Sequence, residues 1–161
     1  MTYIVVPVEG GSGIPPTLTQ LTPITDGSSA GVGQVGELAS ANTAALTVVG
    51  IGASGAWGSA TSLPLQPGVW EIFGNASFAE NTAVMTDFIA VGLSDSATGV
   101  GIGPFDFTQY TPWMAGQPLY VLTPIKRVSI SVPTTYYLNT KFNYSSGTPQ
   151  HAGIIWAMRY S

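Results

Sequence analysis

The sequence predicts an all-β fold, a sandwich or barrel of about eight short strands. Between Ile125 and Tyr160 the residues form three successive runs with a period of two, joined by a proline turn and a loop, as expected of strands with one face on a core. Glycine occurs 20 times and proline 12 times, and both separate short apolar runs along the chain. No segment has a convincing helical period. At 161 residues the chain is long enough for one domain with its own core.

The first half of the domain consists of short apolar runs that end at turn residues. The alternation here is clearest after the corner at Pro67-Gly68. Five residues of that run share one parity and are expected to point inward: Trp70, Ile72, Gly74, Ala76 and Phe78. The expected strands are Gln34 to Ala39, Ala44 to Ile51, a strand ending at Ser62 to Leu65, and Val69 to Phe78.

The second half ends in three consecutive strands. Before them, Ala83 to Ser94 allows two registers because Asp87 shares parity with Ile89. A loop region rich in glycine, proline and aromatic residues follows over 99–118, and then a brief strand, Pro118 to Thr123. In the three closing strands we expect these residues to point inward: Val128, Ile130, Val132; Tyr136, Leu138, Thr140, Phe142, Tyr144; Ile154, Trp156, Met158, Tyr160.

Residues 1–32 differ from the β-sandwich domain, which we place at residues 33–161. They combine glycines, prolines and a threonine-rich stretch, which favour an extended N-terminal arm with turns. Near its start the arm has an apolar segment with strand propensity that needs a partner sheet or groove. We predict that these residues dock on a partner protein: Tyr3, Ile4, Val5, Val6 and Val8.

Charge is scarce and unevenly distributed. Only 7% of residues are charged, against about a quarter in a typical domain, so much of the surface is expected to be buried against other chains. The net charge of −4 and the lack of basic clusters argue against nucleic acid as a partner. No apolar run reaches the roughly 18 residues of a membrane helix, so no membrane partner is expected.

All eight acidic residues precede all four basic residues in the chain. This order predicts pairing between early and late strands, and parity assigns Glu71, Lys141 and Arg159 to the polar faces of their strands. Exposed pairs of this kind contribute only about 0–1 kcal/mol each.

Motifs for catalysis and for cofactor or metal binding are weak, and we expect no enzyme, cofactor or metal site. Gly31 to Gly36 and Gly50 to Gly55 match the GxGxxG pattern of dinucleotide sites, but neither is followed by a predicted helix. His151 is the only histidine and there is no cysteine, so a zinc site or a catalytic triad lacks its usual residues. Paired carboxylates in one cleft, drawn from Glu71, Asp95 or Asp106, leave a small glycan-active enzyme as a remote alternative.

Five aromatic residues are expected in loops that carry little charge. Exposed aromatic residues in loops mark an interface with protein or carbohydrate, and we favour protein contact within an oligomer. These candidate interface residues are Trp57, Phe105, Phe107, Tyr110 and Trp113.

Three segments resemble small structural proteins of tailed bacteriophages. They are GQVGEL (Gly33 to Leu38), SLPLQPGVWEIFGNASF (Ser62 to Phe78) and the closing stretch from Arg127 to Ser161. The resemblance implies a jelly-roll-like antiparallel β-sandwich, commonly trimeric, of the type found in head decoration proteins, head fibres and tail-fibre tips. It implies no catalytic residues, and it does not extend to residues 1–32.

The resemblance and the residues together suggest a virion structural protein. We expect a capsid decoration (cement) protein that forms a homotrimer and docks on the major capsid protein, or another virion protein, through its N-terminal arm. The alternative is a tail-fibre or tail-tip domain that binds a host-surface glycan or protein, using loop aromatics such as Trp57, Tyr110 and Trp113.

Overall fold

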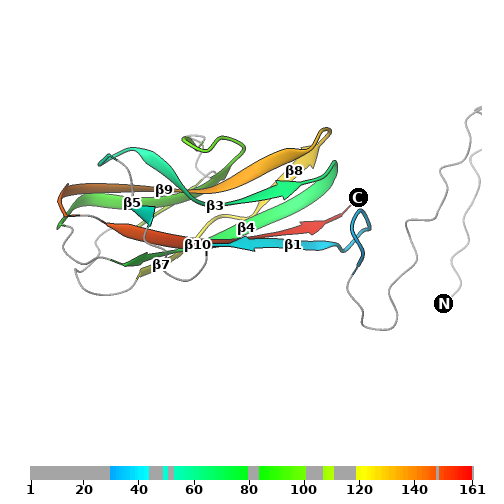
Figure 1. The fold of residues 1–161 in the computed structure, drawn as a ribbon, viewed down its shortest axis with the longest axis horizontal. Helices are drawn as coiled ribbons and strands as arrows, with labels where there is room; N and C mark the ends of the chain where they lie inside the picture. The colour runs from blue at the N-terminus through cyan, green and yellow to red at the C-terminus, as the bar shows by residue number, and fades with distance from the viewer. Residues whose placement is uncertain are drawn as a thin grey trace, which may run out of the picture.

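Two antiparallel sheets pack face to face. The computed structural model describes residues 30–43, 49–50, 53–79, 84–100, 107–110, 119–147 and 149–160. The six-stranded sheet contains β1 (Leu38–Asn42), β2 (Val49–Gly50), β4 (Gly68–Ala79), β7 (Leu119–Leu122), β8 (Lys126–Ile130) and β10 (Gln150–Arg159). The four-stranded sheet contains β3 (Trp57–Leu65), β5 (Val84–Ser94), β6 (Phe107–Tyr110) and β9 (Thr134–Ser146). Figure 1 shows the two layers, with the C-terminus and the start of β1 at one end and β7 toward the other.

The strand order is that of a jelly roll. In the six-stranded sheet β1 and β2 share one side of β10, β4 lies on its other side, and β7 and β8 share the far side of β4. The four-stranded sheet runs β3-β9-β5-β6. If β1 and β2 are counted as one strand, and β7 and β8 as another, the sandwich has eight strands. Numbered again from 1 to 8 along the chain, they follow the order 1-8-3-6 in one sheet and 2-7-4-5 in the other. These are the interlocked Greek keys of a jelly roll. The expected fold class is confirmed.

The core lies between the sheets, and the predicted inward faces of β4 and β9 are confirmed. Leu138 on β9 is fully buried, and across from it β4 and β10 present Gly74 and Gly153. A Cβ on Gly74 would stand 2.8 Å from a Leu138 methyl carbon, and one on Gly153 would stand 2.5 Å from the other. The two glycines therefore make the space into which Leu138 packs.

The predicted orientation of β10 is wrong. Ile155 and Ala157 are fully buried, whereas Met158 and Tyr160 are 39% exposed and Trp156 is half-buried. Both faces of β10 carry apolar residues, so alternation alone could not choose between them. The register decides: Ile155 and Ala157 pair with Gly74 and Ile72, which already face the core. As a result Ile154, Trp156 and Met158 lie on the outer face of the six-stranded sheet.

Other strands differ from expectation mainly at their ends. β1 begins at Leu38 rather than Gln34 because residues 31–36 form turns. β6 lies within the expected 99–118 loop, and Val132 lies beyond the end of β8, where it is 63% exposed. In β5, irregular pairing between Met85 and Ile89 leaves Asp87 exposed while Ile89 enters the core. Residues 44–48 and 51, part of the expected strand Ala44 to Ile51, lie outside the described residues.

Thr43 joins the two sheets at a β-bulge. The register of β3 against β9 shifts between Ser59 and Thr61, which frees the Ala60 carbonyl from the ladder. The Thr43 hydroxyl donates to that carbonyl at 2.6 Å and accepts from the Gly153 backbone N–H at 3.3 Å. One side chain thus ties the end of β1 to β3 and β10.

Replacing Thr43 with valine is expected to lower the free energy of unfolding by about 1–3 kcal/mol, because the bulge carbonyl loses its donor. Chemical denaturation followed by tryptophan fluorescence measures the change. Thr43→Ser keeps the hydroxyl and should cost less than half as much. A valine variant as stable as the wild type would show that the Thr43 bridge contributes nothing.

Candidate interaction surface

The outer face of the six-stranded sheet carries an apolar stripe, defined here as Leu38, Phe73, Trp156 and Met158. The register places Leu38 beside Met158 and Trp156 beside Phe73, so these side chains from β1, β10 and β4 are neighbours. Leu38 is 64% exposed, Met158 39% and Phe73 37%. The Phe73 and Trp156 rings are stacked with their centroids 5.1 Å apart. Contiguous exposed apolar side chains of this kind mark interaction surfaces.

A polar cluster borders the stripe. Glu71 lies opposite Met158 on one side and opposite Arg127 on the other. The Tyr160 hydroxyl donates to Glu71 Oε2 at 2.9 Å, and the Arg127 guanidinium lies 5.0 Å from the centre of the Tyr160 ring. The hydrogen bond to Glu71 raises the pKa of the Tyr160 hydroxyl. An apolar centre with a charged and hydrogen-bonded rim is the usual anatomy of a protein interface.

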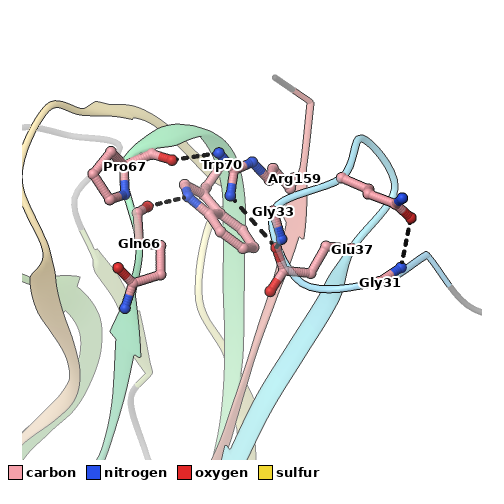
Figure 2. Close-up of polar contacts among 8 residues, drawn as sticks. Gly31, Gly33, Glu37, Gln66, Pro67, Trp70 and Arg159 are labelled. Atoms are coloured by element: carbon pink, nitrogen blue, oxygen red, sulfur yellow. Dashed lines mark hydrogen bonds and ion pairs between the residues drawn. The ribbon is translucent and has the colours of Figure 1, made fainter. Parts of the chain in front are cut away.

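Arg159 fixes the residues that lead into β1 to the end of the sandwich (Figure 2). Its guanidinium lies 3.5 Å from Glu37 Oε2 and donates to the Pro67 carbonyl at 2.5 Å. It also stands 5.5 Å from the centre of the Trp70 ring, whose indole N–H donates to the Gln66 carbonyl at 2.9 Å. This pairing confirms that early acidic and late basic residues meet. The prediction that Arg159 lies on a polar face is wrong, since its side chain is only 11% exposed.

Two glycine turns shape the junction between residues 30–37 and the sandwich. Gly33 and Gly36 have φ values of +83° and +87°, a region that side chains disfavour. The Gly33 N–H donates to Glu37 Oε2 at 2.7 Å, and the Gly36 N–H donates to the Arg159 carbonyl at 2.8 Å. The first GxGxxG match, Gly31 to Gly36, is therefore a turn that leads into strand β1 and not into a helix.

Two of the predicted interface aromatics contact each other. Trp57 and Phe107 lie in β3 and β6, not in loops, and their rings meet edge to face with centroids 5.9 Å apart. They come from the two edge strands of the four-stranded sheet. The outer-face positions of β5 between those edges are Ala90 and Gly92, which are small enough for the rings to approach each other. Both rings are half-buried.

Of the other predicted site residues, only Tyr110 lies among the described residues. Tyr110 is in β6, opposite Ile89, and not in a loop. Phe105, Trp113 and the five residues of the apolar arm segment, Tyr3, Ile4, Val5, Val6 and Val8, lie outside the described residues. Their roles as interface and docking residues stay predictions.

His151, the only histidine, faces the core and not a solvated loop. Its Nδ1 lies 2.5 Å from the Thr140 hydroxyl oxygen on the opposite sheet, and the side chain is 3% exposed. Burial lowers the pKa of His151 to about 4. Neutral at physiological pH, it acts as a hydrogen-bonded bridge between the sheets. No group of three metal-ligating side chains occurs among the described residues.

The apolar stripe was missed because the parity of β10 was assigned the wrong way. The scarcity of charge was the signal that could have revealed it, since a strand with apolar residues on both faces leaves one of them for an interface. In the part of the chain that the structure describes, no helix is long and apolar enough to cross a membrane. Comparison of the sequence with protein-family models and with curated proteins found no match.

Proposed function

We propose that this chain is a structural protein of a tailed-bacteriophage virion, a capsid decoration protein that self-associates and docks on the major capsid protein. The observation that carries the proposal is the apolar stripe on the outer face of a jelly-roll sandwich, at the end where residues 1–30 join it. Jelly rolls also serve as lectin and cupin domains, so the fold alone does not decide among these roles.

The stripe suits contact between copies of the chain. It contains no charged side chain, and Glu71, Arg127 and Tyr160 form a polar rim at its border. A charge-poor surface is costly to leave in water, and covering apolar area contributes roughly 25 cal/mol per Å². Burial of the stripe between copies, most simply as a homotrimer, would stabilise the oligomer.

The junction at Arg159 supports docking through the arm. Because Glu37 and Arg159 hold residues 31–37 against the end of the sandwich, the chain before residue 30 starts from a fixed point beside the stripe. An arm anchored in this way transmits force between the capsid and the oligomer. The predicted mode of attachment is strand addition by Tyr3 to Val8 on a capsid protein.

Two alterations separate self-association from docking. We expect Met158→Glu to shift the full chain from oligomer to monomer in light scattering at micromolar concentration, because it buries a charge in the interface. We expect deletion of residues 1–32 to leave a folded oligomer that no longer co-sediments with phage heads lacking the protein. Val132→Glu, at an apolar residue outside the stripe that is 63% exposed against 39% for Met158, is the control and should change neither property.

Each half of the proposal can fail independently. An unchanged oligomer in Met158→Glu would contradict self-association through the stripe. Head binding that survives deletion of residues 1–32 would contradict docking through the arm. Absence of head binding by the full chain would contradict the decoration role itself.

A further inference from the structure

A hollow of about 370 Å³ lies on the outer face of the six-stranded sheet, next to the apolar stripe. It arises from a step in side-chain size across three strands. Tyr120 on β7 pairs with Ser77 on β4, and Ser77 pairs with Ala152 on β10, so one large ring stands beside two small side chains. Its lining includes Asn42, Asn75, Ser77, Tyr120, Ala152 and Ile154. A hollow of this size falls within the range of small-molecule sites.

The lining carries no charge. It offers two carboxamides, the hydroxyls of Ser77 and Tyr120, and the apolar surfaces of Ala152 and Ile154. The Thr43 hydroxyl is already engaged by the Ala60 carbonyl and the Gly153 N–H. A phosphate, a carboxylate or a cationic ligand would find no opposite charge among these side chains. The lining therefore fits a neutral ligand that both donates and accepts hydrogen bonds.

Two of the polar residues present hydrogen-bonding groups at the hollow. The Asn75 side-chain oxygen is buried, and no described residue donates a hydrogen bond to it. A buried acceptor without a donor is destabilising, and a ligand hydroxyl that reached it would supply the missing hydrogen bond. Asn42 lies in the same row, two strands away: it pairs with Ile154, which pairs with Asn75. Its side chain is exposed, with an amide that can donate and an oxygen that can accept.

Tyr120 supplies the flat surface. It is 67% exposed on an edge strand of four residues. Its aromatic ring is therefore largely in contact with water, and a ligand that covered the ring would bury its apolar surface. A sugar ring has one face of C–H groups, which packs on an aromatic ring, and a periphery of hydroxyl groups, which suits carboxamides and hydroxyls. We propose that this hollow binds a neutral saccharide, with one sugar residue stacked on Tyr120 and its hydroxyl groups on Asn75 and Asn42.

This inference goes beyond capsid decoration and does not depend on it. The hollow begins at the row of Asn75 and Ile154, the next outward positions on β4 and β10 after Phe73 and Trp156 of the stripe, and continues towards Tyr120 on β7. Contact between copies that is confined to the stripe would leave Tyr120 able to meet a cell-surface glycan. Saccharide binding and head binding are measured separately, so either can fail alone.

The test uses the full chain and an array of oligosaccharides. The array carries neutral hexose, deoxyhexose and N-acetylhexosamine chains, with sialylated and uronic-acid chains for comparison. We expect binding to a subset of neutral chains. Saturation-transfer NMR with the best of them should show the strongest transfer to the C–H groups of one sugar residue.

Matched variants locate the site. Tyr120→Ala should weaken binding at least tenfold, Tyr120→Phe should keep it within about threefold, and Asn42→Ala should weaken it severalfold. Leu122→Ala, on the same strand and 62% exposed but outside the lining, should leave binding unchanged. Absence of binding to any neutral chain at millimolar concentration would overturn the proposal. Equal binding by Tyr120→Ala and the wild type, or a preference for charged chains, would also overturn it. The same holds if Tyr120 is buried by a second copy of the chain in the oligomer.

Discussion

Replacing Arg159 with methionine is expected to lower the free energy of unfolding by about 3 kcal/mol. The substitution leaves the Glu37 carboxylate, 12% exposed, without the cation that lies 3.5 Å away. Removing one partner of a buried pair costs far more than the net value of the pair, because the remaining charge stays desolvated. The hydrogen bond to the Pro67 carbonyl and the contact with the Trp70 ring are lost as well. Urea denaturation followed by tryptophan fluorescence measures the change.

Two further variants isolate the cause of this loss. Arg127→Met removes an exposed cation from the same end of the sandwich and should cost no more than about 0.5 kcal/mol. The double variant Glu37→Gln with Arg159→Met should be more stable than Arg159→Met alone, because no charge is left buried. Equal losses in Arg127→Met and Arg159→Met would contradict the anchoring role of Arg159.

Acidification from pH 7 to pH 4 is expected to remove about 3 kcal/mol of stability through His151 alone. Burial lowers the pKa of His151 from 6.5 to about 4. Between these values the unfolded chain binds a proton that the folded chain does not. The free energy of unfolding therefore falls as the pH drops through this window and is unaffected by His151 above about pH 6.5. Each pKa unit corresponds to about 1.4 kcal/mol.

The control for this prediction is His151→Leu, which removes the titrating group and keeps an apolar side chain in the core. The free energy of unfolding of both proteins is measured by denaturation at pH 7, 5.5 and 4. Titration of the carboxylates contributes equally to the pH dependence of the wild type and the variant, so it cancels in the comparison. Since the chain has one histidine, the difference between the two pH profiles belongs to His151. Parallel profiles would contradict the assignment of a buried neutral histidine.

The strands that the sequence predicted best are those with one apolar and one polar face. The inward residues of β4 and β9, such as Ile72 and Leu138, were correctly assigned because their alternation has a single interpretation. In β10 the residues Ile154 to Met158 are apolar on both faces, and the prediction was wrong there. The strand β6 lies within the turn-rich region 99–118 and was not predicted, because its four residues are too few to show a period.

The candidate surfaces were harder to foresee than the strands. The low charge of the chain predicts that part of its surface is buried against other chains, but it does not indicate which part. The stripe joins Leu38, Phe73 and Trp156 from three strands, and only their register makes them neighbours. The hollow beside Tyr120 likewise depends on Ser77 and Ala152 being paired across strands. Such pairings are long-range, and no local pattern encodes them.

Local sequence alone is enough to predict that this chain is all-β, with about eight strands and few charges. These properties follow from local alternation, turn residues and composition, which act within a few residues of each other. The packing of the two sheets settles which face of β10 is buried, that His151 bridges the sheets, and that Arg159 holds Glu37 at the start of β1. Glu37 and Arg159 come from distant parts of the chain, and Thr140 and His151 meet because β9 and β10 lie in opposite sheets. In β10, pairing with β4 selects between two faces that look equally apolar in sequence.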